Sequence, residues 1–249
     1  MTSPITRIRI AALGDLHVSK TSQGAFQPLF NQINSTADVL VICGDFTDYG
    51  LEEEARILAR ELTASVKIPI VAVLGNHDYE SGKEVEITHI LRDSGVIVLD
   101  GEAAEVHGVG FAGAKGFCGG FGRGALGPWG ERTIKLFVQE AVDEALKLES
   151  ALAKLRTPQR VALLHYSPIQ DTVEGEPPVI FPFLGSSRLE EPLNRYAVAA
   201  VFHGHAHQGA LEGHTTSGIA VYNVAAPLLH KSFPDQPLFR IVEIPVMPQ

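Results

Sequence analysis

The sequence contains little cysteine and no long apolar run. Only Cys43 and Cys118 occur among 249 residues, which is too few for a disulfide framework, and neither belongs to a C-x-x-C pair. No stretch reaches the roughly 18 consecutive apolar residues of a membrane-spanning helix. Residues 1–9 lack the apolar core of an export signal. These absences favour a cytoplasmic protein that does not cross a membrane.

Basic runs are missing as well. The chain carries 29 acidic and 20 basic residues, a formal net charge of −9, and its Lys and Arg residues are interleaved with acidic or neutral ones. We therefore expect no nucleic acid partner, because a surface that holds a phosphate backbone needs clustered positive charge. Two divalent cations in a site would still supply a local positive charge.

The chain is long enough for one large domain, since 45% of its residues are hydrophobic and α/β domains of this size are common. Seven short runs rich in Val, Ile and Ala predict strands buried on both faces. They are residues 7–13, 39–42, 68–74, 160–164, 197–202, 220–224 and 239–244. Helical signals at 51–64, 84–92 and 131–155 lie between several of them, which predicts a layered α/β fold.

Two segments fit neither pattern. Residues 113–130 contain eight glycines, which are costly in regular structure, and residues 166–187 contain four prolines. Long irregular loops in compact domains are often functional. We interpret both segments as candidate substrate-facing loops of a single domain that spans residues 1–249. For Arg123 and Trp129, a plain surface loop is favoured over a role in holding phosphate or stacking on a base.

Polar motifs follow directly on five of the predicted strands. They are Gly14-Asp15-Leu16-His17, Gly44-Asp45-Phe46-Thr47-Asp48, Gly75-Asn76-His77-Asp78, the isolated His165 and Gly204-His205-Ala206-His207. Because ligands of open α/β sheets bind beyond the carboxyl ends of the strands, we expect these side chains at one edge of the sheet. Imidazole, carboxylate and amide groups without thiolate suit divalent Mn, Fe, Co, Zn or Ni.

A single D-x-H or H-x-H pair is a weak signal, but the ordered set is specific. In this order, the motifs resemble the signature of the calcineurin-like metallophosphoesterase superfamily, and the resemblance extends over most of the chain. It implies a layered β-sandwich flanked by helices and a centre of two divalent metal ions. By this resemblance one ion would be held by Asp15, His17, Asp45 and His207, and the other by Asp45, Asn76, His165 and His205.

The resemblance also implies roles for residues that are not ligands. His77 would contact the phosphate or its leaving oxygen, Asp78 would orient and charge-stabilise His77, and Asp48 would be structural. The implied reaction is hydrolysis of a phosphoester by a hydroxide shared between the two metals. Whether His77 or a metal-bound water protonates the leaving alkoxide stays open at this point.

Two differences from the motifs of other branches indicate which branch of the superfamily the chain resembles. No Arg follows Asp48, whereas the protein phosphatases usually show G-D-x-x-D-R-G and G-N-H-E, and purple acid phosphatases carry Tyr where Asp48 stands. G-N-H-D in a short chain looks more like the bacterial cyclic-nucleotide phosphodiesterases and related enzymes of small phosphoesters. A small soluble phosphodiester or phosphomonoester is therefore the expected substrate.

Two alternatives stay open. DNA-repair nucleases share these motifs, but they usually carry extra domains for DNA, whereas this chain is acidic and compact. A non-catalytic scaffold with the same fold would be expected to have lost ligands, but all seven ligand positions and His77 are filled. Metal-dependent catalysis on a small molecule is the favoured interpretation.

Overall fold

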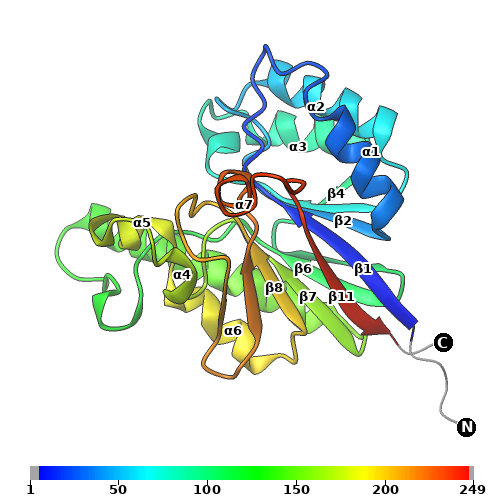
Figure 1. Ribbon diagram of the computed structural model, residues 1–249. Coiled ribbons are helices and arrows are strands. Elements are labelled where there is room, and N and C mark those ends of the chain that lie inside the picture. The colour runs from blue at the N-terminus through cyan, green and yellow to red at the C-terminus, as the bar shows by residue number, and fades with distance from the viewer. Residues whose placement is uncertain (1–5, 247–249) are drawn as a thin grey trace, which may run out of the picture.

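The structure is a computed structural model that describes residues 6–246, and two packed β-sheets organise that part of the chain (Figure 1). The first sheet consists of β1 (Thr6–Leu13), β2 (Val39–Cys43), β3 (Ile70–Val73), β4 (Val96–Val98) and β11 (Arg240–Val246). The second consists of β5 (Glu102–Val106), β6 (Val109–Gly113), β7 (Gln159–Leu163), β8 (Ala200–His203), β9 (Glu212–His214) and β10 (Ala220–Asn223). Their orders are β11-β1-β2-β3-β4 and β5-β6-β7-β8-β10-β9.

Helices cover the outer face of each sheet (Figure 1). The first sheet is covered by α1 (Gln27–Thr36), α2 (Glu52–Ser65) and α3 (Glu84–Asp93). The second is covered by α4 (Arg132–Lys154) and α6 (Glu190–Arg195). Shorter helices are η1 (His77–Tyr79), η2 (Gly122–Gly124), η3 (Asp171–Val173), η4 (Pro178–Ile180), α5 (Phe181–Leu184), η5 (Ser187–Leu189) and α7 (Ala226–Ser232). The predicted layered α/β sandwich flanked by helices is confirmed.

The central strands are buried on both faces, and β2 illustrates the reason. Its side chains alternate between the two sides of the sheet. Val39 and Val41 pack between the two sheets, whereas Leu40 and Ile42 pack against the helices. Both faces need apolar side chains, so the strand is a continuous apolar run. One core between the sheets joins them into a single domain.

The seven predicted strands and three predicted helices are present within three residues at each end. The prediction of burial on both faces is wrong for β11, which pairs antiparallel with β1 at the edge of the sheet and leaves Ile241 39% exposed. The elements that the sequence did not predict include the helices α1, α6 and α7 and the strands β4, β5, β6 and β9. β5 carries two glutamates and β6 two glycines, so neither has the composition of a typical strand.

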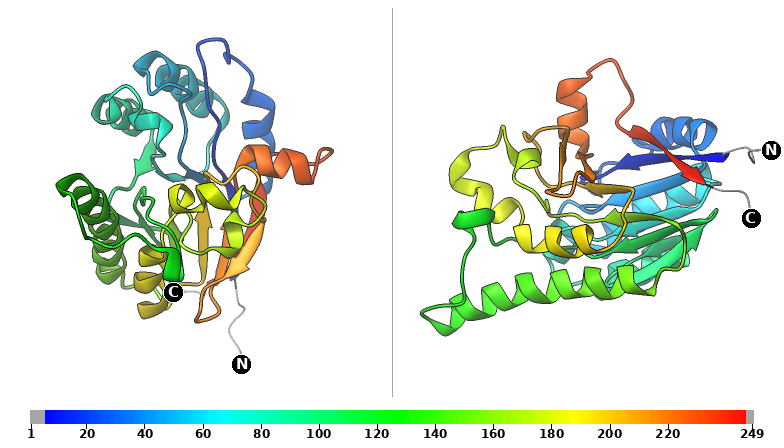
Figure 2. Two further views of the ribbon diagram at one scale, coloured as in Figure 1. Left: turned by 90° about the vertical axis from the view of Figure 1, so that its left-hand side faces the viewer. Right: turned by 90° about the horizontal axis from the view of Figure 1, so that it is seen from below.

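The parallel strands bring their carboxyl ends to one end of the molecule. β1, β2 and β3 run parallel in the first sheet, as do β6, β7 and β8 in the second. Figure 2 (right) shows the connecting loops gathered at the end toward which β1 runs, with the long α4 along one face. None of the helices in residues 6–246 is long and apolar enough to cross a membrane.

Candidate metal centre

Side chains from both sheets converge at this edge. Three groups each place one possible ligand atom per residue within 4.8 Å of the others. These groups are Asp15, His17 and His207; His17, Asp45 and His77; and Asp45, His165 and His205. The first and third groups belong to the two ligand sets that the sequence predicts. The missing amide ligand is close by, because the Asn76 Oδ1 atom lies 2.8 Å from His165 Nε2.

Asp45 occupies the middle of the cluster. Its Oδ2 atom is 3.7 Å from His17 Nε2 and 3.4 Å from His165 Nε2, one histidine from each predicted ligand set. Its other oxygen, Oδ1, accepts a hydrogen bond of 2.8 Å from the backbone N–H of His77. Oδ2 therefore faces both ligand sets, while Oδ1 holds the motif at residues 75–78 in place.

The backbone at these residues is strained. Among residues 6–246, five non-glycine residues have positive φ, and four of them are predicted ligands. These four are Asp15 (58°), His17 (45°), Asp45 (50°) and His205 (69°). Such conformations cost on the order of 1–3 kcal/mol each and persist where the surrounding structure imposes them, often at functional sites. Each left-handed residue turns the chain sharply as it leaves its strand.

Glycines at two of the motifs allow the carboxylates to approach the backbone closely. A Cβ atom at Gly75 would overlap the carboxylate of Asp45, and one at Gly204 would overlap the carboxylate of Asp15. Any larger residue at these positions would push a predicted ligand out of the cluster. At these two motifs the preceding glycine is thus explained by close packing rather than by a need for a flexible loop.

The donor set fits divalent cations. Asp15 and Asp45 are only 3% and 1% exposed, and in the described part of the chain their ion-pair partners are histidines rather than Lys or Arg. Two buried carboxylates without a fixed positive charge are costly. The Nε2 atom of His17 is also buried and has no hydrogen-bond partner, although it faces Asp45. A cation between these groups would satisfy both.

Burial sets the protonation of the histidines in the second predicted ligand set. It lowers the pKa of His205 to about 3 and that of His165 well below its usual value, so both rings are neutral and retain a lone pair. His165 Nδ1 lies 2.8 Å from the carbonyl of Cys43, which leaves Nε2 to face the cluster. By contrast, the hydrogen bond to Asp15 raises the pKa of His207. Burial and the charge of Asp15 raise the pKa of Asp45.

The hydrogen bonds of the Asp78 carboxylate join it to the second motif and to Gly75, and its predicted role toward His77 stays a prediction. Its carboxylate accepts bonds from the backbone N–H groups of Thr47 (2.9 Å) and Gly75 (2.9 Å) and from the Thr47 hydroxyl at 2.8 Å. His77 and Asp78 are consecutive in the 3₁₀ turn η1, whose three residues per turn direct adjacent side chains about 120° apart. Asp78 therefore ties the second motif to the third through the backbone of Thr47 and Gly75.

The ring of His77 is held by Asp48. Nδ1 of His77 lies 2.6 Å from the backbone carbonyl of Asp48, and its ring packs edge-on against His17 with 4.5 Å between the centroids. When Nδ1–H donates to this carbonyl, Nε2 is the nitrogen left for other partners. The structural role expected for Asp48 thus includes orienting His77 through its backbone.

Two buried groups that the motifs did not reveal support the last motif. Asn223 donates to the backbone carbonyls of Ala206 (2.8 Å) and Thr172 (3.3 Å), so it anchors the loop between His205 and His207. His203 Nε2 lies 2.8 Å from the Thr172 hydroxyl. Neither contact leaves a signal in the sequence, because the partners lie more than 15 residues away.

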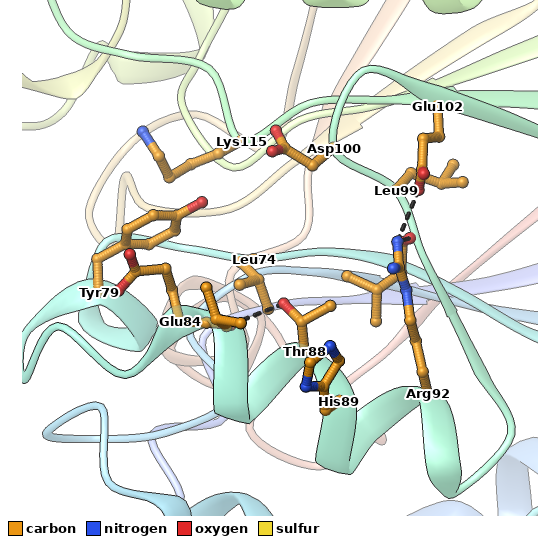
Figure 3. A pocket seen from close by; sticks show the side chains of 12 residues that line it. Leu74, Tyr79, Glu84, Thr88, His89, Arg92, Leu99, Asp100, Glu102 and Lys115 are labelled. Carbon is orange, nitrogen blue, oxygen red and sulfur yellow. Dashed lines mark hydrogen bonds and ion pairs between the residues drawn. The ribbon is translucent and has the colours of Figure 1, made fainter.

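Sequence analysis also missed Lys115, a buried lysine beside the metal centre. Its ammonium group lies 5.0–5.3 Å from the rings of Tyr79, Phe117 and Tyr166, and its backbone carbonyl accepts the N–H groups of His165 and Tyr166. Burial lowers the pKa of Lys115. Figure 3 shows Lys115 and Tyr79 at one end of a cavity of about 300 Å³ that extends along α3.

Solved structures with the same fold include a phosphopantetheinyl hydrolase and a putative 5'-nucleotidase. Phosphopantetheinyl hydrolase from Mycobacterium tuberculosis aligns with a TM-score of 0.67 and 15% identity, over 94% of this chain and 95% of that one. The protein TT1561 of Thermus thermophilus aligns at 0.56 and 14%, over 90% and 91%. A putative 5'-nucleotidase from Staphylococcus aureus aligns at 0.53 and 16%, over 88% of this chain and 48% of that one.

No curated protein matches the sequence. The profile of the calcineurin-like phosphoesterases matches residues 8–209, which is most of the chain and includes every predicted ligand. Together with the paired sheets and the Asp/His clusters, this match establishes the phosphoric ester hydrolase family predicted from the motifs. The chain belongs to the calcineurin-like phosphoesterase family.

Proposed function

We propose that the chain hydrolyses a small phosphodiester or phosphomonoester at a centre of two divalent metal ions. The observation that carries the proposal is the position of Asp45 Oδ2, 3.7 Å from His17 Nε2 and 3.4 Å from His165 Nε2. A single oxygen that faces two separate ligand sets is the arrangement expected of a bridging carboxylate. Two cations held in this way would acidify a water and neutralise the phosphate oxygens.

The proposed ligands divide between two ions, and each set draws on both sheets. The first set is Asp15, His17, Asp45 and His207. The second set is Asp45, Asn76, His165 and His205. Seven residues with nitrogen and oxygen donors and no thiolate suit Mn, Fe, Co, Zn or Ni. Cytoplasmic location stays a prediction.

We assign His77 a role toward the phosphate rather than toward the metals. Its backbone N–H is bound to Asp45 and its Nδ1 to the Asp48 carbonyl, so the ring is fixed beside both ligand sets with Nε2 available. In the protonated form, Nε2–H can donate to a phosphate oxygen or give a proton to the leaving alkoxide. In the neutral form it can accept a proton. His77 also lies within reach of His17 and Asp45, so a ligand role is the competing interpretation.

A nuclease is the second candidate, and it is less favoured. A net charge of −9 and basic residues interleaved with acidic or neutral ones in the sequence do not favour binding of a phosphate backbone, which gains affinity by displacing counterions. A non-catalytic scaffold is disfavoured by the complete set of donors. The strained backbone at four of the donors also favours a working metal site over a scaffold, although a nuclease would share that site.

The test is a substrate panel with each metal added back in turn. The metal-stripped protein would be supplied with Mn, Fe, Co, Zn or Ni and assayed on aryl phosphomonoesters, aryl phosphodiesters, cyclic nucleotides and nucleotides. We expect turnover with at least one metal and its loss in Asp45→Asn, whereas Asp143→Asn, a carboxylate on α4 that belongs to none of the motifs, should keep it. Two bound ions with no turnover of any member would overturn the proposal.

A further inference from the structure

The two irregular segments, 113–130 and 166–187, pair with each other, and we call them the paired loops. Gly120 donates its backbone N–H to the carbonyl of Gly185 at 2.9 Å and accepts from Ser187 at 3.2 Å. These bonds form a parallel bridge between the loops. Backbone pairing of this kind fixes the position of one loop relative to the other, so these segments form a platform rather than two independent coils.

The paired loops have a small core of their own, and it includes the last metal motif. Phe121 comes from the first loop and Val173 and Leu184 from the second, and all three pack with Ala206. Ala206 is fully buried and lies between the predicted ligands His205 and His207 in the sequence. The platform therefore packs directly on the segment that carries two of the proposed ligands.

A backbone contact joins the platform to the metal centre. The carbonyl of Phe183, in α5, lies 3.2 Å from His205 Nε2. Because Nε2–H can donate to this carbonyl, Nδ1 of His205 is left as the nitrogen for a metal, an arrangement common among metal-binding histidines. Phe183 is thus next to His205, one of the proposed metal ligands.

The side chains on this part of the platform are apolar and exposed. Phe183 is 59% exposed and Val179, in η4, is 81% exposed. Single exposed apolar residues are normal on protein surfaces. Phe183 differs from such residues because its own carbonyl lies 3.2 Å from Nε2 of a predicted metal ligand, so its exposed side chain projects from a backbone that adjoins the site. Figure 1 shows α5 near the start of α4, on the side of the second sheet.

We infer that the paired loops recognise the alcohol part of the substrate and that this part is apolar, with Phe183 as its main contact. The inference rests on the proposed phosphoester hydrolysis and specifies the substrate class of that site. The metal ions would bind the phosphate, which every phosphoester shares. Selection among esters must then come from groups that touch the alcohol, and an exposed phenylalanine beside the ligands gains by covering aliphatic or aromatic carbon.

The experiment varies only the apolar tail. Methyl, butyl and octyl diesters of p-nitrophenyl phosphate share one leaving group, so differences in kcat/KM report contacts of the tail; n-alkyl monoesters serve if only monoesters are turned over. In the metal-loaded wild-type protein, kcat/KM should rise by about two- to fourfold per methylene over the first few, the larger value corresponding to complete burial. In Phe183→Ala this rise should shrink to less than half.

Two controls separate recognition from folding. Phe183→Leu should keep most of the dependence on chain length, because leucine also covers carbon. Leu146→Ala removes a side chain that is 54% exposed and lies about 20 Å along α4 from its first residue, so it should change nothing. The metal content should be equal in all variants, since each keeps the carbonyl at residue 183.

Three results would overturn the inference while leaving phosphoester hydrolysis in place. One is a flat dependence on chain length in the wild-type protein, and the second is an equal slope in Phe183→Ala. The third is a preference for the methyl ester. Absence of turnover on every ester would instead count against the proposed function itself.

Discussion

The two sheets contribute residues to the candidate metal centre in different ways. The first sheet contributes Asp15, His17 and Asp45 through tight turns in left-handed conformations directly after β1 and β2, and these turns are bonded to each other. The second sheet contributes His165, His205 and His207, and it also carries the paired loops. This difference supports the proposals that the first-sheet turns hold ligands of the metal ions and that the second-sheet loops recognise the substrate.

The largest effect should follow from damage to the shared carboxylate. Asp45→Asn removes the anionic oxygen that faces both ligand sets, so both ions should be lost, whereas Asp15→Asn should weaken mainly the first. The two buried cations would also be less screened from each other without Asp45. Metal content after dialysis, measured by elemental analysis, checks this prediction. Equal retention of metal in the two variants would remove Asp45 from the bridge.

His77 separates catalysis from metal binding within the first-sheet turns. His77→Gln should keep both metals and the fold, while kcat falls by roughly 10²–10⁴, the range of a positioned acid–base group. The fall should be smaller for p-nitrophenyl esters than for alkyl esters, because nitrophenolate needs little protonation. Paired measurements of kcat and metal content decide the matter. A variant that loses a metal would make His77 a ligand, and one that retains full activity on alkyl esters would exclude it from catalysis.

The residues of the first-sheet turns were easier to predict from the sequence than the strands and buried side chains that surround the site. Continuous apolar runs identified β1, β2 and β3 because these strands are buried on both faces, and the motifs that follow them contain the residues that the structure gathers. β5 was missed because its exposed glutamates are not typical of a strand. Asn223 follows a strand, which left a turn role and a supporting role both open, and its contacts with Thr172 and Ala206 show the supporting role. Lys115 was missed because its importance depends on contacts with residues distant in sequence, which no local pattern records.

Asp78 has a structural contribution that the family resemblance did not indicate. The resemblance implies only a role for Asp78 toward His77, the residue before it. In the 3₁₀ turn the carboxylate points toward the backbone of Thr47 and Gly75. Only the three-dimensional arrangement shows that Asp78 also holds these two turns together.

Asp78→Asn therefore tests the rigidity of the first-sheet turns. An amide in this position has one acceptor oxygen in place of two, so some of the backbone N–H groups of Phe46, Thr47 and Gly75 would lose their partner. Each buried group left unpaired costs about 1–3 kcal/mol, and the melting temperature should fall even in the metal-free protein. Asp93→Asn, at the end of α3, is the control. If only activity fell and stability did not, Asp78 would act through His77 after all.

The smallest expected effect concerns pH and the metal-free protein. Burial and the charge of Asp15 raise the pKa of Asp45 above its ordinary value, so the folded state holds this proton more tightly than the unfolded state does. Stability contributed by the proton is complete below the ordinary pKa and is lost as pH rises toward the folded pKa. The buried histidines, whose pKa values are lowered, act in the opposite direction, but only below their ordinary pKa of about 6.5.

Between pH 7 and pH 8.5 the histidines whose pKa values are lowered should therefore be silent, whereas His207, whose pKa is raised by its hydrogen bond to Asp15, acts in the same direction as Asp45. The metal-free protein should lose up to about 1.4 kcal/mol of unfolding free energy per pH unit for each such proton. Urea denaturation at several pH values after chelation measures this slope. In Asp45→Asn the slope should lose the contribution of about one proton. In the wild-type protein the slope should also become smaller when metal is restored, because a cation then takes the place of the proton. A metal-free protein that is equally stable across this range would mean that Asp45 is already ionised without metal. The charge in the first-sheet turns would then be balanced by groups other than the ions.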